Sequence, residues 1–290
     1  SQDAVIAYMQ SAGFKVSMTF NHRLLVGFKG TIGLAEKTFQ VQINNYRAPS
    51  GRYFYAPTSD PTVPASLAPV IQSIIGLDTA EYFTHPPVYA PVRAHTTVSP
   101  NTLTCPTTSS SLGFLPSQIA TAYNLNGLYN EGFYGEGQTV ALFELDNYVP
   151  TDISDYTSCY GGSTVPIFSI PINGGPGAPS TGAFEVELDM ELVLSAAPQL
   201  ASLRVYETQN DPTDYLAAWA KIVSDDIPVV STSWGSCEAS GVAQAVLAQE
   251  NTLFTTAAAQ GQSIFAASGD FGSNGCGYPT PHAPSVNDPA

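Results

Sequence analysis

Four short apolar runs alternate with helix-like stretches in the second part of the chain, and few folds accommodate this alternation. The runs are Thr139–Leu145, Leu203–Glu207, Ile227–Ser233 and Ser263–Ala267, and the helix-like stretches lie at about 184–197, 213–224 and 239–260. Apolar strands of this kind are typical of a parallel sheet that helices cover on both faces. We therefore predict an α/β fold for this part of the chain.

Polar side chains follow three of these runs. In a parallel sheet, binding and catalytic groups lie beyond the carboxyl ends of the strands. The three ends read Glu144-Leu145-Asp146, Ser233-Trp234-Gly235 and Ser268-Gly269-Asp270. We expect the functional groups of the protein to be at this edge of the sheet.

The first 84 residues have a different pattern, in which short helices and strands alternate. We expect helices at about 3–12, 32–39 and 65–76, and strands at 15–20, 24–29, 41–46 and 52–55. This alternation favours a compact split β-α-β sandwich, a small α+β domain.

Charge also divides the chain. Residues 1–95 contain seven basic and five acidic residues, a net charge of +2, whereas 96–290 contain two basic and nineteen acidic residues, a net charge of −17. The stretch 85–112 is dense in Pro, Ser and Thr and is typical of an exposed linker that proteases cut easily. We therefore predict a first domain at 1–84, a linker with a cleavage region at 85–112 and a second domain at 113–290.

The overall composition excludes some classes of partner and favours one compartment. A formal charge of −15 and a pI of about 4.3 exclude nucleic acids and anionic membranes as partners. No apolar stretch approaches the roughly 18 residues that cross a bilayer. The start at Ser1 has no signal-peptide pattern, so we take it as a processed or an engineered end. The four cysteines fit no zinc site; they allow two disulfides in three connectivities, or free buried thiols. We expect a secreted, extracellular protein with disulfides.

The segment 184–194 places acidic residues where an amphipathic helix has apolar ones. At about 100° per residue, Glu185 and Asp189 lie on the apolar face, whereas Glu187 and Glu191 lie on the opposite face, which we expect to be in solvent. Burial and mutual repulsion of two carboxylates should raise at least one pKa, which would make the pair a poised general base. The alternative is a shifted helix whose Glu185 and Asp189 both reach solvent.

Other single residues are weaker signals. Asp270 lies in a Gly-rich turn, where an acidic residue is often only a turn former, and a lone Trp such as Trp234 is more often part of a core than of a site. The pattern Gly135-Glu136-Gly137 before the first run has neither the third glycine nor the lysine of a nucleotide loop. None of the four histidines offers a metal pair or a partner for a serine.

Taken together, four blocks of residues resemble the sedolisin, or serine-carboxyl, peptidase family in its kumamolisin-like zymogen form. Residues 21–25, 53–56 and 60–64 are similar to the activation domain, 115–124 to the start of the mature enzyme, Glu185 to Asp189 to the catalytic E-x-x-x-D helix, and 268–270 to the segment with the oxyanion aspartate. The resemblance implies an incomplete subtilisin-like sheet in the second domain, preceded by a small ferredoxin-like activation domain.

The resemblance also implies an acid-active endopeptidase. A serine would attack the peptide carbonyl, Glu185 would be its general base, Asp189 would orient Glu185, and protonated Asp270 would donate a hydrogen bond to the oxyanion. A carboxylate can accept a proton at pH 3–4, where an imidazole is already charged. We expect Glu144 and Trp234 to support Asp189 and Glu185 from behind.

The chain departs from the family in one respect. The nucleophile of the family lies in a Gly-Thr-Ser-Ala type motif, which 1–290 do not contain, and neither Ser233 nor Ser268 matches it. The Ca²⁺ that the resemblance implies would also have its ligands C-terminal to residue 290. We therefore expect a truncated chain, or the product of a cleavage after Ala290 that stays bound to a C-terminal chain with the catalytic Ser, and no activity of 1–290 alone.

The expected partners are a protein or peptide substrate and the chain's own activation domain as an intramolecular inhibitor. Because adjacent parallel strands bring the loops after Trp234 and Asp270 together, we predict a Cys237–Cys276 disulfide, which leaves Cys105 and Cys159 to pair. Two alternatives stay open. One is a secreted pseudopeptidase or binding protein without the nucleophile, and the other is a nucleotide-binding parallel-sheet domain, which the negative charge disfavours.

Overall fold

The computed structural model describes residues 1–80, 83, 105, 107, 113–238, 244–274 and 284–289. Its second part is built on a five-stranded sheet with the order β10-β8-β5-β7-β6, in which every neighbouring pair is parallel. The strands are β5 (Thr139–Glu144), β6 (Ile167–Pro171), β7 (Ser202–Glu207), β8 (Val229–Thr232) and β10 (Ser263–Ala266). This confirms the α/β class and the four predicted runs.

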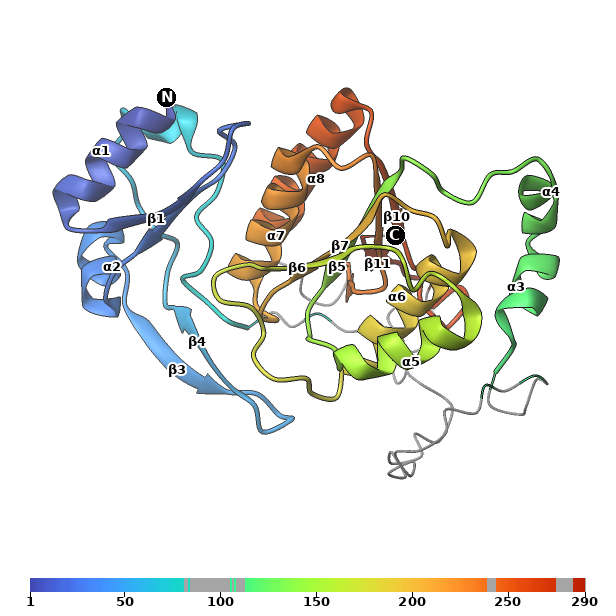
Figure 1. The fold of residues 1–290 in the computed structure, drawn as a ribbon. Helices are drawn as coiled ribbons and strands as arrows, with labels where there is room; N and C mark the ends of the chain where they lie inside the picture. The colour runs from blue at the N-terminus through green and yellow to red at the C-terminus, as the bar shows by residue number, and fades with distance from the viewer. Residues whose placement is uncertain are drawn as a thin grey trace.

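Helices cover both faces of this sheet (Figure 1). On one face α5 (Pro150–Tyr160) packs against α6 (Ala183–Ala196), and on the other α7 (Pro212–Asp225) packs against α8 (Gln244–Gln260). Two short helices, α3 (Pro116–Ala122) and α4 (Leu125–Asn130), precede the sheet, and α3 contacts α6. The apolar side chains of β5 and β7 and the inner faces of α6, α7 and α8 form one large hydrophobic cluster.

The sequence did not predict β6 or α5. β6 is an edge strand in which only Ile167 and Ile170 are half-buried, and its apolar residues do not alternate with polar ones. α5 has a polar sequence that buries only Ile153 and Thr157. Both elements bury few side chains of their own, so their positions depend on tertiary packing.

The first 57 residues form α1 (Gln2–Ala12), β1 (Lys15–Thr19), β2 (Val26–Lys29), α2 (Ile32–Phe39), β3 (Ile43–Arg47) and β4 (Tyr53–Pro57). β1 pairs with β2 and β3 with β4, both antiparallel, as two separate two-stranded sheets. The expected ferredoxin-like sheet is therefore present as two hairpins, and among the described residues no strand of one pairs with a strand of the other. The two hairpins and two helices share a hydrophobic cluster of their own around Met9, Phe14 and Phe39.

The prediction of a helix at 65–76 is wrong. Only a 3₁₀ turn forms there, η1 (Ala68–Val70). Pro69 has no N–H to donate and its ring excludes a carbonyl of the preceding turn, so a continuous helix through this position is strongly disfavoured. After η1, Ile74 packs on the cluster of the first part and Ile75 on the cluster of the second, so this segment joins two cores.

The first part lies against the α7 and α8 side of the sheet (Figure 1). Met18, Phe20 and Leu25 pack on the large cluster, His22 Nε2 lies 3.0 Å from the carbonyl oxygen of Ala220, and Gln72 Nε2 donates to the carbonyl of Ala248 at 3.2 Å. The contact is therefore mainly apolar, with a few hydrogen bonds from side chains to backbone carbonyls around it.

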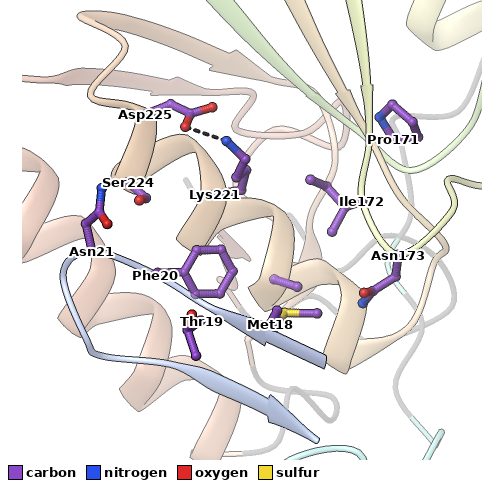
Figure 2. Close-up of a pocket in the computed structure, with 11 residues that line it drawn as sticks. Met18, Thr19, Phe20, Asn21, Pro171, Ile172, Asn173, Lys221, Ser224 and Asp225 are labelled. Atoms are coloured by element: carbon purple, nitrogen blue, oxygen red, sulfur yellow. Dashed lines mark hydrogen bonds and ion pairs between the residues drawn. The ribbon is translucent and has the colours of Figure 1, made fainter. Parts of the chain in front are cut away.

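A cavity of about 370 Å³ lies at this junction (Figure 2). The turn after β1 lines it from one side, and the chain after β6 and the outer face of α7 line it from the other. Its two charged side chains, Lys221 and Asp225, pair with each other, and the amide of Asn173 donates to Asp214 at 2.6 Å. The cavity is a gap between two packed surfaces, and none of its lining residues belongs to the ends of β5, β8 or β10 discussed below.

Two disulfide predictions have different outcomes. Cys105 and Cys159 form a disulfide, with a Cα–Cα distance of 5.3 Å, as predicted. Cys237 is also disulfide-bonded, but Cys276 lies outside the described residues, so the Cys237–Cys276 pairing stays a prediction.

Most of the predicted linker 85–112 lies outside the described residues too. Among the described helices, none combines the length and the apolar character that a membrane span requires.

Candidate active site

The carboxyl ends of β5, β8 and β10 lie side by side, because these three strands are neighbours in the sheet. They place Glu144, the pair Ser233 and Trp234, and Asp270 at one edge. Glu144 and Trp234 are buried, Ser233 is half-buried and Asp270 is exposed. Helix α6 adds Glu185 and Asp189 from the face that it covers.

A network around Asp146 fixes the start of α6. The carboxylate of Asp146 accepts hydrogen bonds from the backbone N–H groups of Gly182 at 2.8 Å and Ser180 at 3.1 Å, and from the Ser180 hydroxyl. It therefore caps α6 from another segment, since Gly182 at the N-cap has no side chain. A Cβ atom on Gly182 would lie 2.7 Å from the Trp234 ring and 2.8 Å from Asp146 Oδ2, so only glycine allows this approach.

Glu185 lies in the first turn of α6 and is 5% exposed. Its pKa is raised to about 7, mainly by burial and also by the negative charges of Asp189 and Asp270, while a hydrogen bond with Ser233 opposes the shift. Asp270 is therefore near enough to act on Glu185 although it belongs to a different loop. The helix phase is the predicted one, with Glu185 turned inward.

Asp189 is joined to two of its neighbours. The Ser233 hydroxyl donates to Asp189 Oδ1 at 2.8 Å. Burial raises the Asp189 pKa to about 6, and hydrogen bonds with Ser233 and Glu144 hold it below the value that burial alone would give. Sequence reasoning placed Ser233 at the edge of the sheet but gave it no function; its contact with both acids of α6 depends on the register of β8.

Glu144 is completely buried, and burial and the charge of Asp189 raise its pKa well above the ordinary value. The Trp234 indole Nε1 donates to Glu144 Oε2 at 2.7 Å, and this bond opposes the shift. Glu144 Oε1 and Asp189 Oδ2 have no donor among the described protein groups. A proton held by Glu144 and shared with Asp189 satisfies both oxygens. It also explains why this contact lowers the pKa of Asp189 and raises that of Glu144.

Thr232 brings Trp234 to Glu144. Its hydroxyl accepts a hydrogen bond from the Trp234 backbone N–H at 3.2 Å and donates to the Phe143 carbonyl at 3.2 Å. This side chain thus ties the end of β8 to β5 and turns the chain so that the indole lies over the sheet edge. Together the contacts form a chain of interacting groups that runs from Trp234 through Glu144, Asp189 and Glu185 toward Asp270.

The expectation that Glu187 and Glu191 lie in solvent is wrong. Glu187 Oε1 accepts from the Val149 backbone N–H at 2.9 Å. Burial raises the Glu191 pKa to about 7, with further contributions from Glu187 and Asp152. Helix α5, which was not predicted, covers this face of α6, and its Asp152 is one of the charges that act on Glu191.

No group of three or more His, Cys, Asp or Glu side chains is placed to hold a metal ion in the part of the chain that the structure describes. The carboxylates above pair with tryptophan, serine and one another, which suits proton transfer better than coordination of Ca²⁺. The described residues therefore offer no Ca²⁺ site; the expected ligands C-terminal to residue 290 stay a prediction, and no step below involves the ion.

Comparison with known proteins gives consistent matches. The family model for the activation domain of pro-kumamolisin matches residues 1–80. Kumamolisin of Bacillus sp. (strain MN-32) is 32% identical over 253 residues, which cover 84% of this chain and 44% of that protein. Sedolisin of Pseudomonas sp. (strain 101) is 28% identical over 300 residues, which cover 99% of this chain and 49% of that protein.

The solved structures give the same answer for the fold. Pseudomonas sedolisin, a serine-carboxyl proteinase complexed with two molecules of pseudo-iodotyrostatin, is similar with a TM-score of 0.53 and 27% identity, over 61% of this chain and 51% of that one. The chain spans about half the length of the curated relatives named here.

Proposed function

The chain belongs to the sedolisin family, and we propose that it is the activation domain and the N-terminal part of the catalytic domain of an acid-active serine-carboxyl endopeptidase. The observation that supports this most is the chain of buried carboxyl groups at the sheet edge, with Glu185 between Asp189 and Asp270. Five acidic and aromatic side chains from four segments converge there, an arrangement that proton transfer uses and that stability alone disfavours.

In the proposed reaction, Glu185 accepts the proton of a serine hydroxyl as that oxygen attacks the peptide carbonyl. The serine would come from residues C-terminal to 290. Asp189 holds Glu185 through the Ser233 hydroxyl, and the proton on Glu144 keeps Asp189 in place. Asp270, exposed at the next loop, donates to the oxyanion in its protonated form, and Glu185 returns its proton to the leaving amine.

The raised pKa of Glu185 places a condition on this proposal. With a pKa of about 7, Glu185 holds its own proton in acid and cannot accept another. A hydrogen bond donated to a carboxylate lowers its pKa. We therefore propose that the serine hydroxyl, on joining the site, lowers the Glu185 pKa into the acid range.

The activation domain is proposed to inhibit the enzyme and to loosen in acid. Burial raises the pKa of Asp214 on α7, and the charge of Lys29 in the first part opposes this rise, so a favourable charge interaction crosses the junction. Protonation of Asp214 in acid removes this interaction between Lys29 and Asp214. Protonation of acidic residues also weakens the general attraction between residues 1–95, with a net charge of +2, and residues 96–290, with a net charge of −17. Cutting would then occur within 85–112.

The test uses the full-length gene product, sequenced downstream of Ala290 for a Gly-Thr-Ser motif. We expect hydrolysis of a protein substrate in acid, new N-termini between 85 and 112 after incubation at pH 3–4, and much slower processing at pH 7. Glu185→Gln should lower the hydrolysis rate by about 10²–10⁴-fold, whereas Glu131→Gln, at an exposed position, should not change it.

Cuts confined to the 1–84 part, or processing that is equally fast at neutral pH, would contradict the zymogen proposal. Absence of the serine motif downstream would favour the second candidate, a secreted pseudopeptidase or binding protein, which the lack of that motif in 1–290 keeps open. Secretion itself is proposed on the Cys105–Cys159 disulfide, because such bonds persist in oxidising compartments.

A further inference from the structure

Phe83 lies between the matched activation domain and the predicted linker, yet its side chain is part of the catalytic portion. It is completely buried and belongs to the large hydrophobic cluster. Its ring stacks on Tyr215 of α7 with a centroid distance of 3.8 Å and an interplanar angle of 3°. Stacked aromatic pairs at this distance contribute more than the burial of their area.

The backbone of Phe83 is held as closely as its ring. The Phe83 N–H donates to Asn210 Oδ1 at 2.9 Å, and Asn210 Nδ2 donates to the Phe83 carbonyl at 2.7 Å. One side-chain amide thus satisfies both polar groups of one residue, as the edge of a β-strand would. Apolar packing alone does not require this, whereas recognition of a peptide segment does.

The catalytic portion builds this site without help from Phe83. Asp211 caps α7 by accepting from the N–H groups of Thr213 at 2.9 Å and Asp214 at 3.1 Å, which fixes the turn that carries Asn210. The Tyr215 hydroxyl donates to Glu250 on α8 at 2.5 Å, and Phe143 of β5 packs edge-on against the Tyr215 ring at 5.0 Å. Both recognition groups are therefore fixed by contacts within the second part.

We propose that Asn210 and Tyr215 form a peptide-docking site whose ligand is the chain's own segment around Phe83, bound by contacts that do not depend on the covalent connection. The site lies on the α7 side of the sheet, whereas Glu185 and Asp189 belong to α6 on the other side. It would hold the end of the activation domain on the catalytic portion after a cut in 85–112, and so delay its departure.

The test needs no peptidase activity, so its failure is distinct from failure of the proposed function. The probe is a fluorescein-labelled peptide with the sequence of residues 79–87, and the control peptide has Ala in place of Phe83. Binding is measured by fluorescence polarisation to three full chains: the unmodified chain, Phe83→Ala, and Phe83→Ala with Asn210→Ala.

We expect the probe to bind Phe83→Ala at least tenfold more tightly than the unmodified chain, because only in the variant is the Tyr215 ring uncovered, so that the probe can displace the weakly held residue 83 from Asn210. The control peptide should bind neither chain, and Asn210→Ala should remove the gain. Equal affinity of the probe for the first two chains, or no binding to a Phe83→Ala chain that is folded by circular dichroism, overturns the proposal.

Amide hydrogen exchange supplies a second test if Phe83→Ala does not fold. In the otherwise unmodified chain, Asn210→Ala should speed exchange of the Phe83 amide at least tenfold relative to Gln209→Ala, a matched change at the exposed neighbouring position. Equal exchange rates in the two variants would show that Asn210 does not hold the segment, and would also overturn the proposal.

Discussion

Glu144 and Trp234 show how one hydrogen bond controls a buried acid. Glu144 is fully buried, and the indole of Trp234 is the donor that opposes the rise of its pKa. The aromatic ring also fills the space above Gly182, so the residue has an electrostatic and a steric effect at once. The two effects can be separated by changing only the N–H donor.

Trp234→Phe should raise the pKa of Glu144 further, because its carboxylate loses the donor that favours the charged form. Leaving the buried Oε2 without a partner should lower the free energy of unfolding by about 1–3 kcal/mol at neutral pH. The checks are a pH titration by carboxyl infrared spectroscopy with Glu144→Gln as reference, and urea unfolding. An unchanged titration in Trp234→Phe would contradict the inferred control.

The titration of Glu185 is the second prediction at this scale. In 1–290 its carboxyl band should titrate near pH 7, and in a full-length protein with the serine it should titrate at least one pH unit lower. Carbon-13 labelled glutamate, assigned by comparison with Glu185→Gln, provides the measurement. If the two proteins titrate alike, the proposed effect of the serine hydroxyl is wrong and acid activity loses its physical basis.

The position of α6 depends on contacts outside the helix. Asp146 caps it, Gly182 lets it approach Trp234, and α5 covers its outer face. Because Glu185 lies only one turn from the cap, a displacement of the helix start moves the candidate base directly.

Gly182→Ala tests this dependence. The added methyl group would overlap Trp234 and Asp146, so we expect a loss of about 1–3 kcal/mol in the free energy of unfolding and a changed Trp234 fluorescence spectrum. Gly127→Ala in α4 is the control, because its Cβ would have no neighbour nearer than 3.9 Å and alanine favours helices. Similar unfolding curves for the two variants would refute the close packing at Gly182.

Acidic groups buried throughout the second part determine how the whole molecule responds to pH. Burial raises the pKa values of Glu185 and Glu191 to about 7 and that of Asp189 to about 6, and it raises that of Glu250 well above the ordinary value. Between about pH 4.5 and 7, the folded chain keeps protons on these groups, whereas the unfolded chain loses them. Its free energy of unfolding therefore falls as pH rises from about 4.5 to 7.

We predict a higher melting temperature at pH 4.5 than at pH 7. Glu250→Gln should reduce this difference, because an amide keeps an acceptor for the Tyr215 hydroxyl and cannot ionise beside Asp288. Exposed Glu131→Gln should leave the difference unchanged. The melting temperatures are measured by calorimetry at constant ionic strength. A melting temperature of the unmodified chain that rises from pH 4.5 to pH 7 would contradict the prediction.

The Cys105–Cys159 disulfide restricts how the activation domain can be released. A cut between 85 and 104 separates the two parts, whereas a cut between 105 and 112 leaves them joined through the bridge to α5. For any cut in the second range, intact mass without reductant should show one species that separates into two only after reduction. Two species before reduction would exclude such a cut as the sole one, or would show that the bridge is not formed.

The sequence alone determined the elements that carry a strong local pattern. The apolar runs fixed β5, β7, β8 and β10, and the spacing of Glu185 and Asp189 placed both on the inner side of α6. These features depend on the intrinsic periodicity of strands and helices and on the apolar area of each segment. The roles of the site residues remain proposals.

Only the tertiary structure decided what covers each face and which polar groups meet. β6 and α5 lack the periodic apolar pattern that predicts an element, and the half-buried state of Glu191 follows from α5 rather than from its own helix. Pro69 replaced an apparently periodic helix by an extended segment between two cores. The contacts of Asp189 with Ser233, and of Phe83 with Asn210, join residues 44 and 127 positions apart, and such pairings depend on strand register and chain packing, which local sequence does not encode.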